Sequence, residues 1–208
     1  MVPRTVVVKM ATFRQIDSIF SPRTAQSAPR TFHPVLPLVL GAVLATPILT
    51  FWLLDLRIAF TGSACPPGIY RATALRPGDT LAHGELVLVC LSTTLARFAL
   101  ARGYLARGAG CGDGIEPVGK RIGALVGDAL EVTPDYVAVN GQRLPNSASR
   151  TRDTRRRNVP HIAFGTYQVA DGEVWLFGEA DPRSWDSRYF GAVPTSAVRA
   201  ELKPVITW

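Results

Sequence analysis

An uninterrupted apolar segment near the N-terminus is the strongest constraint on how this chain can fold. Residues 35–54 contain no charged side chain. As a helix they would extend about 30 Å, which is roughly the hydrocarbon thickness of a bilayer. Pro37 and Pro47 would be costly in a soluble helix but are tolerated in membrane helices, and the Phe51–Trp52 pair lies near the end, where aromatic rings favour the interface. This pattern predicts a single transmembrane anchor over residues 34–57.

The charge before this segment predicts its orientation. Residues 1–34 carry five basic side chains and one acidic side chain, so their net charge is 5 − 1 = +4. The positive-inside rule then places residues 1–33 in the cytoplasm as a basic, flexible tail. Residues 58–208 are expected in the periplasm, in a protein held in the inner membrane. Met10 is an alternative start within the tail.

A cleavable signal peptide is the rival interpretation, because the small residues Gly62-Ser63-Ala64 follow the apolar segment. A lipoprotein site that ends at Cys65 is a second alternative. The N-terminal region and the apolar run are both longer than is usual in signal peptides, and Gly62 stands where lipoproteins have a branched aliphatic residue. An uncleaved anchor is therefore the better prediction.

Composition and charge exclude several classes of protein. The chain is 47% hydrophobic, which is too much for a disordered protein, and residues 35–208 carry only 7 − 4 = +3, which argues against a nucleic-acid-binding surface. The three cysteines form no C-x-x-C pair, and the three histidines lack zinc-ligand spacing. We therefore expect no metal, no other cofactor and no nucleic-acid partner. The sequence leaves open whether Cys90 and Cys111 form a disulfide, with Cys65 free.

The part of the chain from about residue 58 onward predicts short strands joined by turns, and hence a mainly β domain with one core. Residues 85–91 are typical of a buried strand. Two hairpins are predicted over residues 136–144 and 167–177, because an Asn-Gly or Asp-Gly pair separates two strand-like runs in each.

One stretch, Thr94–Arg107, predicts a helix, with Thr93 or Thr94 as its N-cap and Gly108 at its end. The Gly-rich run 108–114 lacks the G-K-[ST] ending of a phosphate-binding loop and predicts a flexible loop. Residues 149–157 hold five arginines. A solvated loop is the favoured interpretation of that segment, and contact with anionic lipid head groups is the alternative.

Three motifs in the exported part occur in a consistent order. The first is Thr61-Gly-Ser-Ala-Cys-Pro66, the second is Lys120-Arg-x-x-x-Leu-x-Gly-Asp128, and the third is Ser184-x-Asp-Ser-Arg-x-x-Gly191. Each alone has an ordinary structural interpretation as a turn serine, a surface lysine or a local ion pair. Together they resemble the type I signal peptidase family, whose members use a serine nucleophile and a lysine general base.

Further residues narrow this resemblance to the TraF-like conjugative transfer signal peptidases. The similar segments are Pro66-x-Gly-x-Tyr70, Ala101–Leu105 and Cys111-x-x-Gly114, and the resemblance covers roughly residues 35–205. It implies a signal-peptidase-like complex β fold with one short inserted helix, preceded by the transmembrane helix. It also implies an enzyme that cleaves the precursor of a conjugative pilin and, in some systems, joins the ends of the pilin into a ring.

Three positions depart from the pattern of this family. The TraF-like motif commonly has proline two residues after the nucleophile, which would put that serine at Ala64; the spacing of the broader family favours Ser63. Val126 replaces a usual proline, and Glu179-Ala180 replaces the usual start of the third motif.

The chemistry of a serine/lysine pair sets a condition on the lysine. For Ser63 to attack a carbonyl, Lys120 must be neutral so that it can accept the serine proton. Burial disfavours the ammonium form, and the apolar residues on both sides of Lys120 are suited to build such a pocket.

The resemblance implies roles for four more residues. The Thr61 hydroxyl and the backbone N–H of Ser63 would bind the oxyanion, and Ser184 would orient the lysine amine. Asp186 and Arg188 would form a supporting ion pair that fixes the Ser184 loop.

The position of the nucleophile predicts where the enzyme works. Ser63 lies six residues after Arg57, which is at most about 20 Å of extended chain beyond the predicted anchor. The expected partners are therefore the lipid bilayer, a membrane-anchored pilin precursor as substrate and proteins of a conjugative transfer or secretion apparatus. The alternative is a non-catalytic anchored β-domain that assists assembly of such an apparatus. A self-cleaving repressor is disfavoured, because the chain has a membrane segment and no DNA-binding segment.

Overall fold

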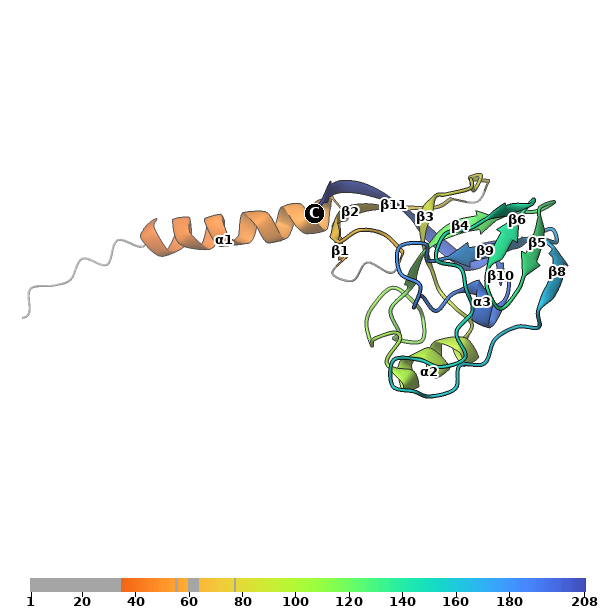
Figure 1. Cartoon of the computed structure of the whole chain (residues 1–208). Helices are drawn as coiled ribbons and strands as arrows, with labels where there is room; N and C mark the ends of the chain where they lie inside the picture. Colours follow the sequence, from red (N-terminus) through yellow and green to blue (C-terminus); the bar gives the residue numbers. More distant parts are fainter. Residues whose placement is uncertain (1–34, 55, 60–63, 77) are drawn as a thin grey trace, which may run out of the picture. The chain divides into compact units, whose positions relative to one another are not determined.

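The computed structural model describes residues 35–54, 56–59, 64–76 and 78–208 (Figure 1). The chain divides into two compact units, residues 1–43 and 44–208.

The apolar segment forms helix α1 (Val35–Leu53), which contains Pro47. Among the residues that the structure describes, no helix is long and apolar enough to cross a membrane. The anchor expected over residues 34–57 therefore stays a prediction. Its last two residues belong to a strand, because β1 begins at Leu56.

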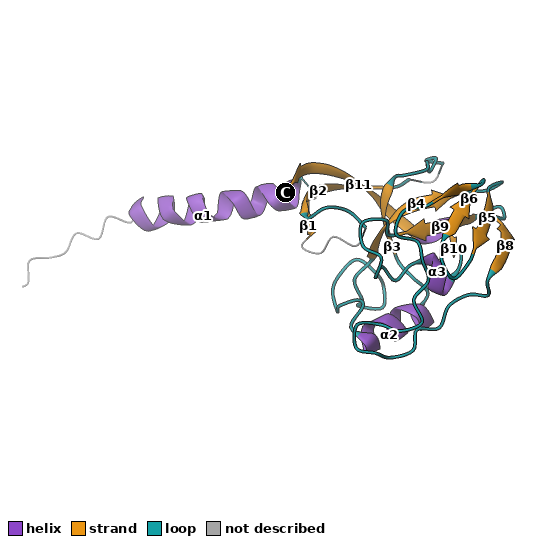
Figure 2. Ribbon diagram, viewed as in Figure 1, coloured by secondary structure: helices purple, strands orange, loops and turns teal. Residues whose placement is uncertain are grey.

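The remaining elements are mostly strands, as Figure 2 shows, and the prediction of a mainly β domain is confirmed. Within the described residues the strands are β1 (Leu56–Ala59), β2 (Gly68–Ala74), β3 (Leu86–Val89), β4 (Val118–Ala124), β5 (Ala129–Val132), β6 (Val137–Val139), β7 (Gln142–Arg143), β8 (Gly165–Gln168), β9 (Glu173–Phe177), β10 (Val193–Pro194) and β11 (Val198–Thr207). The helices after α1 are α2 (Thr93–Arg102), α3 (Ser187–Phe190) and the 3-10 turn η1 (Thr195–Ala197).

These strands form two antiparallel sheets in the described part of the chain. The larger has the order β1-β2-β11-β3-β4-β9-β10, and the smaller has the order β7-β6-β5-β8. The last strand along the chain, β11, pairs with both β2 and β3 and so lies inside the larger sheet.

Strand β9 contributes to two hydrophobic cores. Val174 and Leu176 pack into a first core with residues of β3, β4 and α2. Trp175 and Phe177 pack into a second core with residues of the smaller sheet. Successive side chains of a strand point to opposite faces, so a strand buried on both faces has a continuous apolar sequence. Strand β4 also contributes to both cores, with Ile122 in the first and Ala124 in the second, because the pairing of β4 with β9 shifts register between these two residues.

The first predicted hairpin is confirmed. Strands β6 and β7 pair across Asn140 and Gly141. Their φ angles are 49° and 79°, and positive φ at both central residues is what a type I′ turn requires.

The second predicted hairpin is wrong. A turn does lie at Asp171-Gly172, closed by the bond from the Glu173 N–H to the Ala170 carbonyl. The strands on either side of this turn belong to different sheets, because β8 pairs with β5 and β9 pairs with β4 and β10. Since β9 buries both faces, it occupies an inner position of the larger sheet and does not form a two-stranded ribbon with the exposed β8.

The predicted helix is shorter than expected. Helix α2 has Ser92 as its N-cap and ends at Gly103, whose φ of 73° is left-handed. The N–H groups of Gly103 and Tyr104 bond back to the carbonyls of the last helical turn, so the chain leaves the helix before Arg107.

The Gly-rich run after α2 is tied to the end of β3. A disulfide joins Cys90 to Cys111, and Cys65 is a buried free thiol, which answers the question that the sequence left open. The arginine-rich segment 149–157 is bonded to the C-terminal end of α2, because Arg157 donates to the Arg102 carbonyl and Arg102 donates to the Asn158 carbonyl. Figure 1 shows the chain around residue 155 passing beside α2.

A glycine pair on β4 tests the packing at the boundary of the two cores. A Cβ on Gly123 would overlap the ring of Phe177, whereas a Cβ on Gly119 of the same strand would meet Leu88 only at 4.0 Å. We expect Gly123→Ala to lower the free energy of unfolding by about 1–3 kcal/mol. Gly119→Ala should change it by less than about 0.5 kcal/mol. Urea denaturation of the full-length chain measures both; equal effects would contradict the packing described.

Candidate active site

Lys120 lies on the inward face of a central strand, at a position where the alternation of β4 calls for an apolar residue. Its neighbours on that face are Val118 and Ile122, and all three side chains are buried. Lys120 is only 3% exposed. Its amine donates a hydrogen bond to the Ser184 hydroxyl, with 2.6 Å between Nζ and Oγ.

The surroundings of this amine lower its pKa. Burial is the main cause, since it penalises the charged form, and the nearby Arg188 acts in the same direction. The negative charges of Asp186 and Asp181 oppose the shift but do not outweigh the loss of solvent. Burial therefore shifts Lys120 toward the neutral amine, which is the form that can accept a proton.

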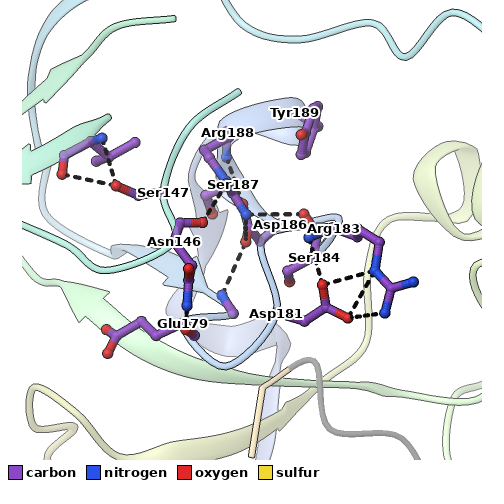
Figure 3. A network of polar contacts seen from close by, with 12 residues as sticks. Asn146, Ser147, Glu179, Asp181, Arg183, Ser184, Asp186, Ser187, Arg188 and Tyr189 are labelled. Carbon is purple, nitrogen blue, oxygen red and sulfur yellow. Dashed lines mark hydrogen bonds and ion pairs between the residues drawn. The ribbon is translucent and has the colours of Figure 1, made fainter. Parts of the chain in front are cut away.

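Ser184 is positioned by a buried ion pair that comes after it in sequence (Figure 3). The Arg188 guanidinium binds the Asp186 carboxylate through two bonds of 2.8 Å, and the two side chains are 1% and 0% exposed. Arg188 also donates to the Ser184 carbonyl at 3.1 Å, and so holds the backbone of the residue that contacts Lys120.

Other bonds of this pair join the loop to the rest of the domain. The Asp186 carboxylate accepts the N–H of Gly178, at the end of β9, and the Arg188 guanidinium donates to the carbonyls of Asn146 and Ala148. Buried charges are tolerated when they are paired and fully hydrogen-bonded, as they are here.

Lys120 and Ser184 line a cleft of about 920 Å³. Ala64 and Cys65 line the same cleft, although they are 5% and 7% exposed. Their segment is held by Tyr70, whose hydroxyl donates to the Pro66 carbonyl at 2.7 Å.

The predicted nucleophile and oxyanion donor, Ser63 and Thr61, lie outside the described residues. Of the six predicted site residues, the structure brings four together: Lys120, Ser184, Asp186 and Arg188. A neutral amine in a cleft can act as a general base toward a hydroxyl that comes within hydrogen-bond reach.

Comparison with known proteins assigns the chain to a family. The model of the family described as "Signal peptidase, peptidase S26" matches residues 35–208.

The chain belongs to the signal peptidase family. Within that family it is TraF-like. It is 35% identical over 150 residues to the plasmid transfer protein TraF of Escherichia coli, covering 71% of this chain and 81% of that protein. It is also 35% identical over 179 residues to a probable conjugal transfer protein TraF of Sinorhizobium fredii, covering 83% of this chain and 90% of that protein.

The crystal structure of a signal peptidase I from Enterococcus faecalis matches 60% of this chain and 98% of that one, at 20% identity and a TM-score of 0.34. A likeness at this level adds nothing to the family assignment.

Several cleft residues of this signal peptidase were not predicted from its sequence. Arg150 belongs to the arginine-rich segment, Val159 comes two residues after the end of that segment, and Tyr104 lies just beyond α2. No local pattern marks these residues, because only the docking of the arginine-rich segment on α2 brings them to the cleft. Asn146 was also missed; its side chain donates to the Glu179 carbonyl at the altered start of the third motif.

The buried ion pair makes a strong prediction about stability. Asp186→Asn leaves the Arg188 charge buried without its partner, and we expect it to lower the free energy of unfolding by about 3–5 kcal/mol. Asp181→Asn is the matched control, since Asp181 pairs with the exposed Arg183 in the same loop. That change should cost no more than about 1 kcal/mol. Urea denaturation compares the two; a loss for Asp186→Asn as small as that of the control would contradict the role given to the pair.

Proposed function

We propose that this signal peptidase is a membrane-anchored serine endopeptidase that cleaves a membrane-inserted pilin precursor at the outer face of the inner membrane and so supports formation of a conjugative pilus. Ser63 is the nucleophile and Lys120 is the general base. The observation that carries the proposal is the buried amine of Lys120, which is bonded to Ser184 in a cleft also lined by Ala64, the residue next to Ser63.

The proposed reaction depends on the properties of these groups. The Ser63 hydroxyl attacks the scissile carbonyl while neutral Lys120 takes its proton. The Thr61 hydroxyl and the Ser63 N–H stabilise the tetrahedral oxyanion. The ammonium of Lys120 then returns the proton to the leaving amine, which breaks the peptide bond and leaves an acyl ester on Ser63. Either water or the amine at the other end of the same pilin chain then attacks that ester. Lys120 takes the proton of the attacking group and returns it to the departing Ser63 oxygen, which gives a linear or a ring-closed product and free Ser63.

The membrane and conjugation parts of the proposal have separate support. The relatives are named as plasmid transfer and conjugal transfer proteins, which supports a role in conjugation. The uncharged segment 35–54 supports the anchor, and its closeness in sequence to Ser63 suits a substrate whose cut site lies at the membrane surface.

Processing of a pilin precursor tests the proposed dyad. Ser63→Ala and Lys120→Ala should each abolish the trimming of a co-expressed precursor, since one removes the nucleophile and the other its base. Mass spectrometry of the pilin gives the readout, and the loss of one water relative to the trimmed linear peptide identifies ring closure. Ser196→Ala and Lys203→Ala, at exposed positions, are the matched controls and should process normally. Processing by either dyad variant would refute the assignment.

The pKa of Lys120 predicts how the rate depends on pH. Because only the neutral amine accepts the serine proton, kcat/KM should rise with pH as Lys120 loses its proton. Burial lowers the pKa of Lys120, so the rise should occur below the range of an ordinary lysine, whose pKa is about 10.4. A pH series of initial cleavage rates measures this, with the fold checked by circular dichroism at each pH. A rise centred on the ordinary lysine range would speak against a buried base.

A further inference from the structure

Two arginines of the cleft have no carboxylate partner among the residues that the structure describes. The cleft is lined by Arg150, Arg152 and Arg183, and among the described residues only the last of these forms an ion pair, with Asp181. The guanidinium groups of Arg150 and Arg152 make neither a hydrogen bond nor an ion pair within the described part of the chain, and both residues are exposed. They are therefore available to a ligand in the cleft.

The backbone that carries these two side chains is fixed. The N–H of Arg150 donates to the Tyr189 hydroxyl at 3.0 Å, and Arg152 forms a strand-like bridge with Asn158. The intervening Asp153 is held by the Tyr104 hydroxyl at 2.8 Å and by Arg157. Since the backbone is tied down on both sides, Arg150 and Arg152 are attached at fixed points of one wall of the cleft.

The acidic groups at the cleft do not neutralise this wall. Asp153 is paired with Arg157 and lies near Arg102, and Asp181 is paired with Arg183. Hydrogen bonds from Arg183, together with the nearby charge of Arg150, lower the pKa of Asp181 to about 2, so this carboxylate stays ionised.

A third acid, Glu116, packs against Gly108, at the end of the bridge between Arg107 and Ile115. Glu116 lines the same cleft, and within the described residues it forms no ion pair with Arg150 or Arg152. The wall formed by Arg150 and Arg152 therefore keeps two guanidinium groups that form no ion pair within the described residues, and the carboxylate near Arg150, Asp181, is already paired with Arg183.

We propose that Arg150 and Arg152 form a carboxylate-recognising wall of the substrate cleft, which selects peptides that carry an acidic side chain or a free chain end near the bond to be cut. This inference rests on the proposed peptidase function and names a class of substrate for the same cleft. Arginine suits the role, because its planar guanidinium can bind a carboxylate through two parallel hydrogen bonds.

Binding of three matched peptides tests the proposal. Each probe is an N-acetylated heptapeptide of alanine and serine around one central residue: glutamate with an amidated end, glutamine with an amidated end, and glutamine with a free end. Binding is measured at low salt to the full-length Ser63→Ala chain, and mass spectrometry verifies that the peptides stay intact. We expect at least one carboxylate peptide to bind about fivefold more tightly than the neutral one. The glutamate probe and the free-end probe distinguish the two sources of the carboxylate.

Two double variants with the same change of charge locate the effect. Arg150→Gln/Arg152→Gln should abolish the preference, whereas Arg155→Gln/Arg156→Gln should keep it, since those two arginines belong to the same segment but do not line the cleft. Circular dichroism verifies that both variants are folded. A chain without any carboxylate preference, a preference that survives in the first variant, or an equal loss in both variants would overturn the proposal.

This experiment separates the two proposals. It measures affinity on a protein that lacks the proposed nucleophile, so a failure of carboxylate selection leaves the pilin-processing test unchanged. A failure of processing by the native chain would instead refute the peptidase assignment, whatever the peptides bind.

Discussion

The burial of one amine is the constraint on which the site depends. Strand β4 places Lys120 between Val118 and Ile122 on its inward face, where a charged ammonium would lose its hydration. A neutral amine with a hydroxyl partner meets that condition, and Ser184 provides the partner. The Asp186–Arg188 pair then satisfies the charges of the loop internally, so the loop can approach the amine without a free charge. Burial thus shifts Lys120 toward the neutral amine that the proposed reaction requires.

The site also depends on how the two sheets are joined. Strands β4 and β9 are neighbours, and each contributes to both cores. Lys120 lies on the first strand, and the loop that carries Ser184 comes directly after the second. The distance between the amine and the hydroxyl is therefore set by one strand pairing and by a loop that the Asp186–Arg188 pair holds in place.

The sequence predicted the features that depend on neighbours along the chain. The turn at Asn140-Gly141 depends only on the backbone preferences of these two residues. Lys120 and Ser184 could be predicted because each lies in a short motif with characteristic spacing, and the structure brings the two together. The hairpin expected at Asp171-Gly172 failed, because the turn fixes where the chain reverses but not which strand it then joins.

Features that depend on packing at long range were not accessible from the sequence. The helix expected to reach Arg107 ends at Gly103, because this glycine adopts a left-handed conformation and the arginine-rich segment is bonded to the last residue of the helix. The cleft wall at Arg150 was predicted to be a solvated loop, since nothing near it in sequence indicates a cleft.

The position of strand β11 in the sheet has a consequence for the time at which the cleft forms. This strand holds β2 and β3 together in the larger sheet, and its Leu202 lines the cleft with Ala64 from the other end of the domain. Because β11 is an inner strand of this sheet and follows its other described strands in sequence, the cleft can form only after residue 207 has been synthesised. The order of the strands thereby delays formation of the cleft until β11 has been made.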